Sequence, residues 1–380
     1  MKIMHLSDLH IGIRLHQYDL REEQRYIFRQ IIDCASKECP DVVVVAGDIY
    51  DKSVPSAEAV KLFDEFITEL RDARQDMPIM IISGNHDSAQ RIDCFREILK
   101  EKAIYMVGLP PQKMEDKIEK VIVEDEYGQV CFYLLPFVKP TFVREIIGEE
   151  VNSYDEAVKI LLEREEYDLQ QRNVLVSHQF FVKEKEDAEK VERAENEVYT
   201  VGNIDSVTTG CLEPFDYVAL GHIHKPMKVG KDSIRYCGTP MAYSLSEEGQ
   251  EKGILMVTLT EKGDKPEIET FPLKPLHEVR KVRGTLDEVL GVPSDDYIWV
   301  SLTDKADMEI GDMHIRLLEA FPNLLGVHNE NSVSMATEDV EWEQLREAVP
   351  FDLMMQFCPD LEEEEQEIIK DVINTVRGGM

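Results

Sequence analysis

The feature that constrains this chain most is the segment VVVVAGDIYD, which runs from Val42 to Asp51. Four consecutive valines without polar alternation indicate a β-strand that is buried on both faces. Gly47 and Asp48 follow where this strand leaves its sheet, the edge at which α/β proteins place their chemistry. An aspartate at a strand end is also an ordinary turn residue, so the segment alone does not identify a site.

Four further segments repeat this arrangement of an apolar run followed by metal-ligand side chains. They are Asp8-Leu9-His10, Gly84-Asn85-His86-Asp87, Ser177-His178 and Gly221-His222-Ile223-His224. Six of the ten histidines of the chain lie in or beside the five segments, a concentration that isolated core or loop histidines do not explain. Carboxylate, amide and imidazole groups at converging strand ends are typical of a metal centre.

The spacing of apolar residues predicts alternating strands and helices over the first part of the chain. The predicted elements are strand Ile3–Leu6, helix Glu22–Lys37, the Val42 strand, a helix that starts at Pro55 and Ser56, and strand Ile79–Ile82. Each of these strands ends in a candidate ligand, which favours a mostly parallel α/β core. Residues 118–135 read as a hairpin around a polar turn, so we expect mixed rather than purely parallel sheets.

The organisation of the chain predicts three parts. Residues 1–275 hold all the candidate ligands, residues 276–335 read as a small separate α/β unit, and residues 336–380 read as two helices without strands. The second helix carries an apolar stripe that so short a pair of helices cannot bury within itself. The stripe consists of Ile368, Ile369, Val372, Ile373 and Val376. We therefore expect residues 336–380 to dock on another protein.

The charge balance limits how the protein can meet nucleic acid. With 42 basic and 76 acidic residues the net charge is −34, which argues against a broad non-specific grip on a polyanion. Any contact with DNA must therefore be local. The best basic cluster follows the last histidine motif and consists of Lys225, Lys228, Lys231 and Arg235. An ordinary solvated surface is an equally good interpretation of so small a cluster.

Cysteine usage and hydropathy bear on the compartment. The seven cysteines form no CxxC pair, which indicates reduced buried thiols rather than disulfides or a zinc site. Neither a signal-type segment nor an apolar run of bilayer-spanning length is present. We therefore expect a soluble cytoplasmic protein that does not associate with membranes.

The ligand types narrow the choice of metal. Two ions about 3.5–4 Å apart need a shared ligand, usually a carboxylate, and we predict that Asp48 is this bridge. Imidazole, carboxylate and amide ligands suit manganese, iron or zinc. The number of candidate ligands and the absence of thiolates favour two manganese ions.

In their order along the chain, the five motifs resemble those of the calcineurin-like metallophosphoesterase superfamily over residues 1–270. The motifs are Asp-x-His, Gly-Asp-x-x-Asp, Gly-Asn-His-Asp, a single His after a strand, and Gly-His-x-His. The resemblance implies an α/β fold of two mixed β-sheets face to face, flanked by helices, and hydrolysis of phosphoesters at a dinuclear metal site. It also implies the ligands of each ion. Asp8, His10, Asp48 and His224 would hold one ion, and Asp48, Asn85, His178 and His222 the other.

Four longer stretches are similar to one branch of the superfamily, the nuclease subunits of bacterial DNA end-processing complexes. They are MKIMHLSDLHIG, GNHDSAQR, FDYVALGHIHKP and YCGTPMAYS. By this resemblance, residues 276–335 correspond to a capping domain, and residues 336–380 to a helix-loop-helix that binds the coiled coil of an SMC-like ATPase. It implies a manganese-dependent DNA exonuclease and endonuclease for repair and recombination, which uses a metal-activated water and forms a homodimer of nuclease domains.

His86 is predicted to be catalytic rather than a ligand. Asn85 and His86 are adjacent, so their side chains diverge in an extended segment, and His86 is left to face the scissile phosphate. An imidazolium there stabilises developing charge or protonates the leaving oxygen. The resemblance implies that Asp51 supplies the carboxylate behind His86. The alternative is that Asp51 caps the Pro55 helix and His86 packs in a turn.

Two other functions stay open at this point. A small-molecule phosphodiesterase or nucleotide pyrophosphatase would suit the acidic charge better, but such an enzyme has no need of residues 276–380. A nuclease-dead scaffold for the ATPase would not need intact ligands at all five motifs. The sequence gives neither the polarity of digestion nor the way in which ATP controls it.

Overall fold

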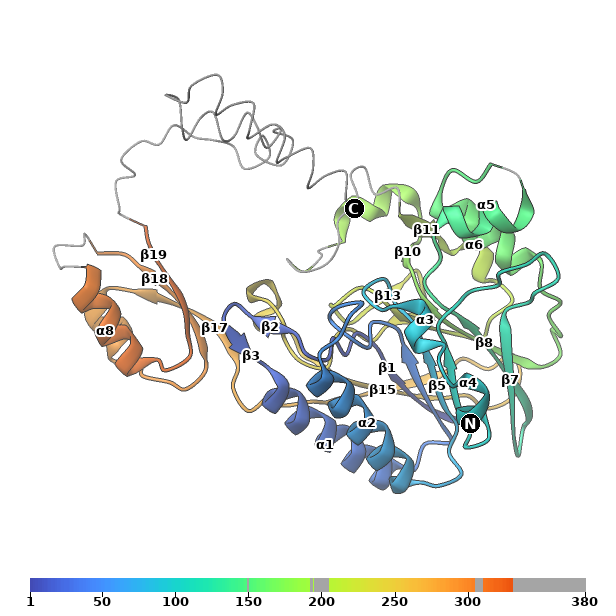
Figure 1. The fold of residues 1–380 in the computed structure, drawn as a ribbon, viewed down its shortest axis with the longest axis horizontal. Coiled ribbons are helices and arrows are strands. Elements are labelled where there is room, and N and C mark those ends of the chain that lie inside the picture. The colour runs from blue at the N-terminus through green and yellow to red at the C-terminus, as the bar shows by residue number, and fades with distance from the viewer. Residues whose placement is uncertain (149, 192–193, 195–204, 305–309, 331–380) are drawn as a thin grey trace, which may run out of the picture. The chain divides into compact units, whose positions relative to one another are not determined.

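The structure is a computed structural model that describes residues 1–148, 150–191, 194, 205–304 and 310–330 (Figure 1). The two predicted C-terminal helices and the apolar stripe that starts at Ile368 lie outside the described residues.

A six-stranded mixed sheet with the strand order β16-β15-β1-β4-β5-β6 contains the N-terminal motifs. Its strands are β1 (Lys2–Leu6), β4 (Val42–Ala46), β5 (Ile79–Ile82), β6 (Ile104–Val107), β15 (Gly253–Thr258) and β16 (Glu267–Pro272). The four strands from β1 to β6 are parallel, whereas β15 is antiparallel to both β1 and β16. The helices α1 (Arg21–Glu38) and α2 (Ala57–Ala73) lie together along one face of this sheet (Figure 1).

A second six-stranded sheet has the order β13-β14-β12-β9-β8-β7. Its strands are β7 (Glu119–Asp125), β8 (Gly128–Leu135), β9 (Arg172–His178), β12 (Tyr217–Gly221), β13 (Met227–Val229) and β14 (Lys231–Tyr236). The helices α5 (Pro140–Ile147) and α6 (Tyr154–Glu163) pack on its outer face. The predicted helix Tyr154–Tyr167 therefore ends four residues early, because Tyr167 folds back and its hydroxyl donates to the Leu162 carbonyl over 2.8 Å.

The two sheets pack face to face around a shared apolar layer. Val42 and Val44 of β4 lie in this layer with Val174 and Val176 of β9. The alternate residues of β4 point the other way and pack in the core with α1 and α2. The four-valine strand is therefore buried on both faces, and the predicted α/β fold of two facing mixed sheets with helices outside is confirmed.

A third, three-stranded sheet follows the two large ones. It consists of the parallel strands β17 (Val279–Gly284), β18 (Tyr297–Leu302) and β19 (Leu324–Asn329), with α7 (Leu286–Leu290) and α8 (Ile310–Ala320). It has an apolar core of its own around Ile298, Val300 and Phe321. Residues Met1–Asn329 nevertheless form one compact unit, so the boundaries predicted after residues 275 and 335 stay predictions.

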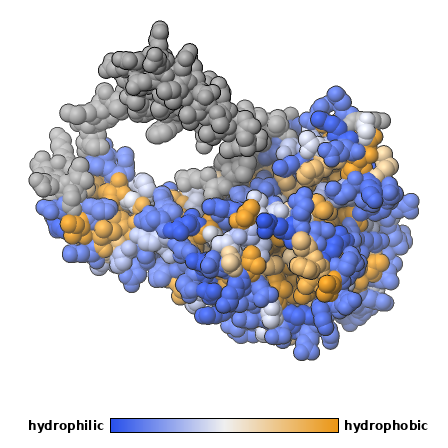
Figure 2. Space-filling model, in the orientation of Figure 1, coloured by the Kyte–Doolittle hydropathy of each residue, from blue (hydrophilic) through white to orange (hydrophobic). Residues whose placement is uncertain are grey.

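Several short elements escaped the sequence analysis because each is too short to show a period. They are β2 (Arg14–Leu15), β3 (Tyr18–Asp19), α3 (Ala89–Ile92), α4 (Arg96–Lys100), β10 (Phe180–Val182), β11 (Ser206–Thr208) and three 3₁₀ turns at Lys185–Lys190, Thr209–Leu212 and Leu245–Glu247. No helix among the described residues is long and apolar enough to cross a membrane. Hydrophilic side chains cover most of the face seen in Figure 2.

Candidate metal centre

All five predicted ligand segments come together at the carboxyl ends of strands from both large sheets. In the first sheet, β1, β4 and β5 lead into the loops that carry Asp8, Asp48 and Asn85. In the second sheet, His178 is the last residue of β9, and His222 follows directly after β12. Parallel neighbours within each sheet end at one edge, and the two sheets face each other, so the ligand segments of both halves meet there.

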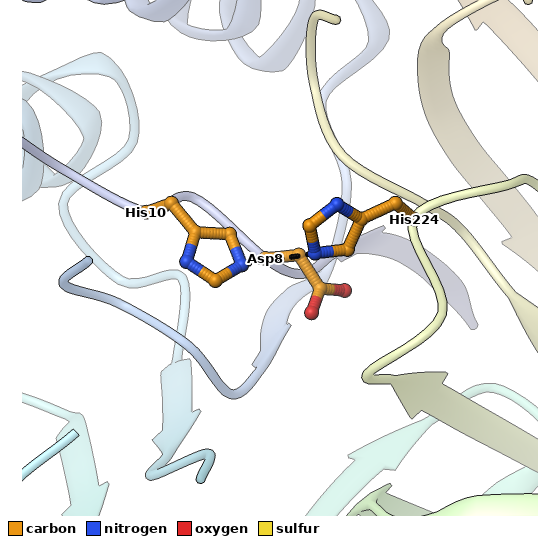
Figure 3. A group of neighbouring side chains, drawn as sticks. All are labelled: Asp8, His10 and His224. Atoms are coloured by element: carbon orange, nitrogen blue, oxygen red, sulfur yellow. Dashed lines mark hydrogen bonds between the residues drawn. The ribbon is translucent and has the colours of Figure 1, made fainter. Parts of the chain in front are cut away.

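One group of candidate ligands consists of Asp8, His10 and His224 (Figure 3). Their ligand atoms lie within 4.8 Å of one another, and all three residues are buried. The Nε2 atoms of His10 and His224 are 3.1 Å apart, and Figure 3 shows the two rings turning these nitrogens towards each other beside Asp8. Two imidazole nitrogens and a carboxylate in this arrangement can hold a divalent cation.

A second group lies on the other side of Asp48. The Nε2 atom of His178 is 3.2 Å from Oδ2 of Asp48 and 3.1 Å from Oδ1 of Asn85. The same Asn85 oxygen is 2.9 Å from Nδ1 of His222. Oδ2 of Asp48 also lies 3.7 Å from Nε2 of His10 in the first group. Asp48 is therefore in contact with both groups, the position required of a shared ligand.

The chemistry of the cluster fits divalent cations. Nδ1 of His10 is buried and has no hydrogen-bond partner among the residues that the structure describes. Buried polar atoms are nearly always satisfied, so such an atom indicates a missing ligand. The predicted ligands supply carboxylate oxygens, an amide oxygen and imidazole nitrogens, the donor types of manganese, iron and zinc sites.

The charges of the cluster respond strongly to one another. Burial opposes the imidazolium form of His178, but the Asp48 carboxylate outweighs it and raises the pKa of His178 to about 9. Burial also opposes ionisation of Asp48, but His178 and its hydrogen bond hold the pKa of Asp48 well below its usual range. Burial keeps the pKa of His10 well below 6.5, so this imidazole is neutral. Because metal ligands must be deprotonated, a cation at Asp48 competes with the proton on His178.

The backbone at the centre is held in unusual conformations. Four predicted ligands have positive φ angles, which are uncommon for residues other than glycine: Asp8 at 52°, His10 at 42°, Asp48 at 49° and His222 at 101°. Such conformations cost on the order of 1–3 kcal/mol each and concentrate at functional sites.

Glycines beside the ligands permit the close packing of the centre. A Cβ atom on Gly84 would lie 2.1 Å from Oδ1 of Asp48, and one on Gly47 would lie 2.3 Å from Nδ1 of His178. Both distances are far inside van der Waals contact, so only glycine fits at either position.

His86 and Asp51 lie at the edge of the first group. Asn85 turns towards His178 and His222, whereas the ring of His86 packs 4.9 Å from that of His10, so the two adjacent side chains diverge. Nδ1 of His86 lies 3.1 Å from the main-chain carbonyl oxygen of Asp51, rather than contacting its carboxylate as the resemblance implied. The ligand atoms of His10, Asp51 and His86 also lie within 4.8 Å of one another.

Asp87, to which the sequence analysis gave no role, ties two ligand loops together. Its carboxylate accepts hydrogen bonds from the main-chain N–H groups of Ile49 (3.0 Å), Tyr50 (2.9 Å) and Gly84 (2.9 Å). Burial, reinforced by the nearby Asp48, raises the pKa of Asp87 to about 6. The only sequence signal was its place as the fourth residue of the Gly84 motif.

Three members of the basic cluster contact acidic residues. Lys228 pairs with Asp232 over 2.8 Å, Lys231 pairs with Glu213 over 2.8 Å, and Arg235 donates to the Asp232 carbonyl over 2.8 Å. Lys225 and Lys228 also line a cavity of about 500 Å³. This cavity has apolar walls that include Phe181 and Met227, and Lys225 directly follows His224.

Comparison with known proteins agrees with the geometry of the centre. Residues 1–226 match the family model of the calcineurin-like phosphoesterases. The chain belongs to the calcineurin-like phosphoesterase family. The match spans the five segments as far as His224, so the candidate metal centre of this structure is that of a calcineurin-like phosphoesterase, a family of divalent-metal hydrolases.

Within the calcineurin-like phosphoesterases, the chain is a homologue of SbcD, the smaller nuclease component of SbcCD, from Staphylococcus epidermidis. The two are 31% identical over 338 residues, which cover 87% of this chain and 85% of that protein. The relationship extends beyond the phosphoesterase match into the three-stranded sheet, as the resemblance over the whole chain predicted.

Solved structures with more distant likeness include a dimetal phosphatase from Danio rerio, with 13% identity and a TM-score of 0.39 over 71% of this chain and 99% of that one. GAP50, the anchor in the inner membrane complex of Plasmodium, is 10% identical with a TM-score of 0.37 over 72% of this chain and 89% of that one. The family assignment does not depend on these distant structures.

Proposed function

We propose that this protein is the nuclease subunit of an SbcCD-type complex, a dinuclear-metal DNA exonuclease and endonuclease that processes DNA ends in repair and recombination. The observation that carries the proposal is the convergence of seven ligand side chains from five strand ends, with Asp48 in contact with both groups. The relationship to a nuclease subunit over 87% of the chain supports the choice of DNA as substrate.

The ligands divide into two sets that share Asp48. Asp8, His10, Asp48 and His224 hold one ion, and Asp48, Asn85, His178 and His222 hold the other. We infer manganese, because the donors are imidazoles and hard oxygens without thiolates. When bound, the two ions neutralise phosphate charge and activate a water molecule for attack on the phosphodiester.

His86 is the proton donor of this proposal. Its Nδ1 faces the Asp51 carbonyl at 3.1 Å, which accepts a hydrogen bond and fixes the ring. The other ring nitrogen is then available to protonate the leaving oxygen. Asp51 orients His86 through this main-chain contact, and its carboxylate lowers the cost of the imidazolium from within the same cluster.

DNA meets the protein locally at the basic cluster. Lys225, Lys228, Lys231 and Arg235 follow His224 in the chain, and two of them line the cavity with the Phe181 and Met227 walls. Apolar walls and ammonium groups together suit a nucleotide, which has a flat base and a phosphate. The acidic pairing partners of the cluster instead favour a small phosphodiester as substrate, the second candidate function.

Cleavage assays separate these functions. With manganese, purified protein is expected to cut linear duplex DNA, DNA hairpins and a chromogenic phosphodiester. Cleavage of the chromogenic substrate alone would indicate a small-molecule phosphodiesterase or nucleotide pyrophosphatase. No cleavage of any substrate by a protein that binds two ions would indicate a nuclease-dead scaffold.

Residues 336–380 are the proposed binding element for an SbcC-type SMC-like ATPase, within an assembly that also contains a homodimer of nuclease domains in the cytoplasm. Removing these residues is expected to leave cleavage of the chromogenic phosphodiester intact and to abolish co-purification with the ATPase. The full chain is the control in the same pull-down. Unchanged co-purification would move the interface elsewhere on the chain.

A further inference from the structure

A buried network of charged side chains lies behind His224. The side chain of Glu247 is fully buried, and its Oε1 atom lies 3.6 Å from Nδ1 of His224. Its Oε2 atom accepts hydrogen bonds from Nζ of Lys252 (2.6 Å) and from the hydroxyl of Thr239 (2.8 Å). Buried acids and lysines are rare unless they are paired, so this network needs a reason.

Lys252 connects the same network to the backbone of the ligand loop. Its buried ammonium donates to the main-chain carbonyl of His224 over 2.8 Å and to the Thr239 hydroxyl over 2.8 Å. Glu247 also accepts from the N–H of Tyr243 (3.2 Å) and the hydroxyl of Ser244 (3.0 Å). The carboxylate is therefore held from several sides and cannot swing away from His224.

The two nitrogens of His224 face different surroundings. Nε2 points to His10 and Asp8 at the candidate metal centre (Figure 3), whereas Nδ1 points back towards Glu247. A carboxylate behind a metal-binding imidazole keeps the remaining ring proton on its own side. It thereby fixes the tautomer and the orientation of the ring and increases its strength as a ligand.

We propose that Glu247 is a positioning residue for the metal ligand His224, and that Lys252 fixes Glu247 and the His224 backbone in register with each other. The inference rests on the proposed metal centre but not on DNA as the substrate. Residues 247–252 lie beyond residue 226, outside the region that matches the phosphoesterase family model.

The chain offers a matched control in a second buried carboxylate that pairs with a histidine. Oε1 of Glu23 lies 2.5 Å from Nδ1 of His277, and the Glu23 side chain is only 4% exposed. Neither residue belongs to a candidate metal group within the described part of the chain. Glu23→Gln therefore removes a comparable buried charge next to an imidazole without touching a predicted ligand.

Manganese binding by Glu247→Gln and Glu23→Gln, measured by equilibrium dialysis with metal analysis, tests the proposal. Glu247→Gln is expected to bind one of the two ions about 10- to 100-fold more weakly than the parent protein, the usual loss when such a partner is removed. Glu23→Gln is expected to bind both ions as the parent does. Saturating manganese is expected to restore hydrolysis of a chromogenic phosphodiester by Glu247→Gln.

Equal manganese affinity in Glu247→Gln and the parent would overturn the proposal, even if the variant melted at a lower temperature. Should Glu247→Gln fail to fold, Glu247→Asp keeps the charge beside Lys252 but shortens its reach to His224, and its manganese affinity decides the question in the same way. If the parent binds two ions and cleaves no DNA, the proposed substrate fails while the positioning role is still measured. If the parent binds no manganese, the metal centre itself is refuted, and the positioning role with it.

Discussion

Strand β9 joins two clusters of buried charge that differ in kind. At its first residue, the Arg172 guanidinium pairs with the Asp125 carboxylate and donates to the carbonyls of Gly128 (2.7 Å) and Leu259 (3.2 Å). At its last residue, about 20 Å further on for a strand of seven residues, His178 meets Asp48.

The difference lies in how well each cluster satisfies itself. Around Arg172, guanidinium donors meet carboxylate and carbonyl acceptors, and the Met1 ammonium adds a further ion pair with Asp125 at 2.7 Å. Around His178, imidazoles crowd together, carboxylates lie near one another, and a nitrogen of His10 lacks a partner among the described residues. Buried charge that completes itself stabilises a fold, whereas buried charge that needs a further ion indicates a site.

The comparison is sharpest at Asp48, where we expect the largest effect. Asp48→Ala is expected to abolish phosphodiester hydrolysis and to lower the bound metal from two ions towards none, because this carboxylate contacts both ligand groups. Metal analysis after gel filtration, with hydrolysis of a chromogenic phosphodiester, checks both effects. A variant that lost one ion and stayed active would show that Asp48 is not shared.

His86 tests whether each residue of the centre is a ligand. His86→Ala is expected to keep both ions and DNA binding but to lose about 10²–10⁴-fold in turnover, the usual contribution of general acid–base catalysis. Asp51→Asn should lose less, because the main-chain carbonyl that contacts His86 is retained. If His86→Ala lost an ion and excess manganese restored its rate, His86 would be a ligand.

Arg172 tests the opposite end of β9. Arg172→Met is expected to lower the free energy of unfolding by about 3–5 kcal/mol, because it leaves the largely buried Asp125 without its guanidinium partner. Manganese stoichiometry of the folded variant should stay at two. Urea titration and metal analysis measure the two quantities separately, and a loss of metal would contradict the division between the two clusters.

Acid should weaken the Arg172 end gradually. Burial opposes ionisation of Asp125, but hydrogen bonds from Arg172 and the Met1 ammonium outweigh it and lower the pKa of Asp125 from 3.8 to about 2. A lowered carboxyl pKa contributes stability that is complete above pH 3.8 and is lost as the pH falls through 2. The difference in Tm between the parent and Asp125→Asn should therefore shrink from about pH 5 to about pH 2. A constant difference would mean that the Asp125 charge does not stabilise the fold.

Sequence patterns predicted the strand ends but not what holds them together. The valine run and its counterparts located Asp8, Asp48 and His178, because a buried parallel strand leaves a clear apolar signal and its ligand follows at once. The bonds of Asp87 to Ile49 and Tyr50 join residues more than 35 positions apart, and one aspartate beside a histidine gives no sign of them.

The same limit applies to the charged residues of the C-terminal half. Sequence proximity shows that Asp232 dilutes the basic cluster, but the pair between Lys231 and Glu213 spans 18 positions and emerges only in the fold. Glu247 lies among other acids in the sequence SEEGQEKG, where nothing distinguishes a buried carboxylate from exposed neighbours.

The antiparallel strand β15 determines how short a working piece of this protein can be. All seven predicted ligands lie within the first 224 residues, yet β1 completes its hydrogen bonds on one side only with residues of β15, Gly253–Thr258. A fragment cut at residue 226 would carry every ligand and still expose an open strand edge directly before Asp8, a surface that invites aggregation. The same order applies on the ribosome, because the sheet that begins with the second residue cannot close until residue 258 has been made.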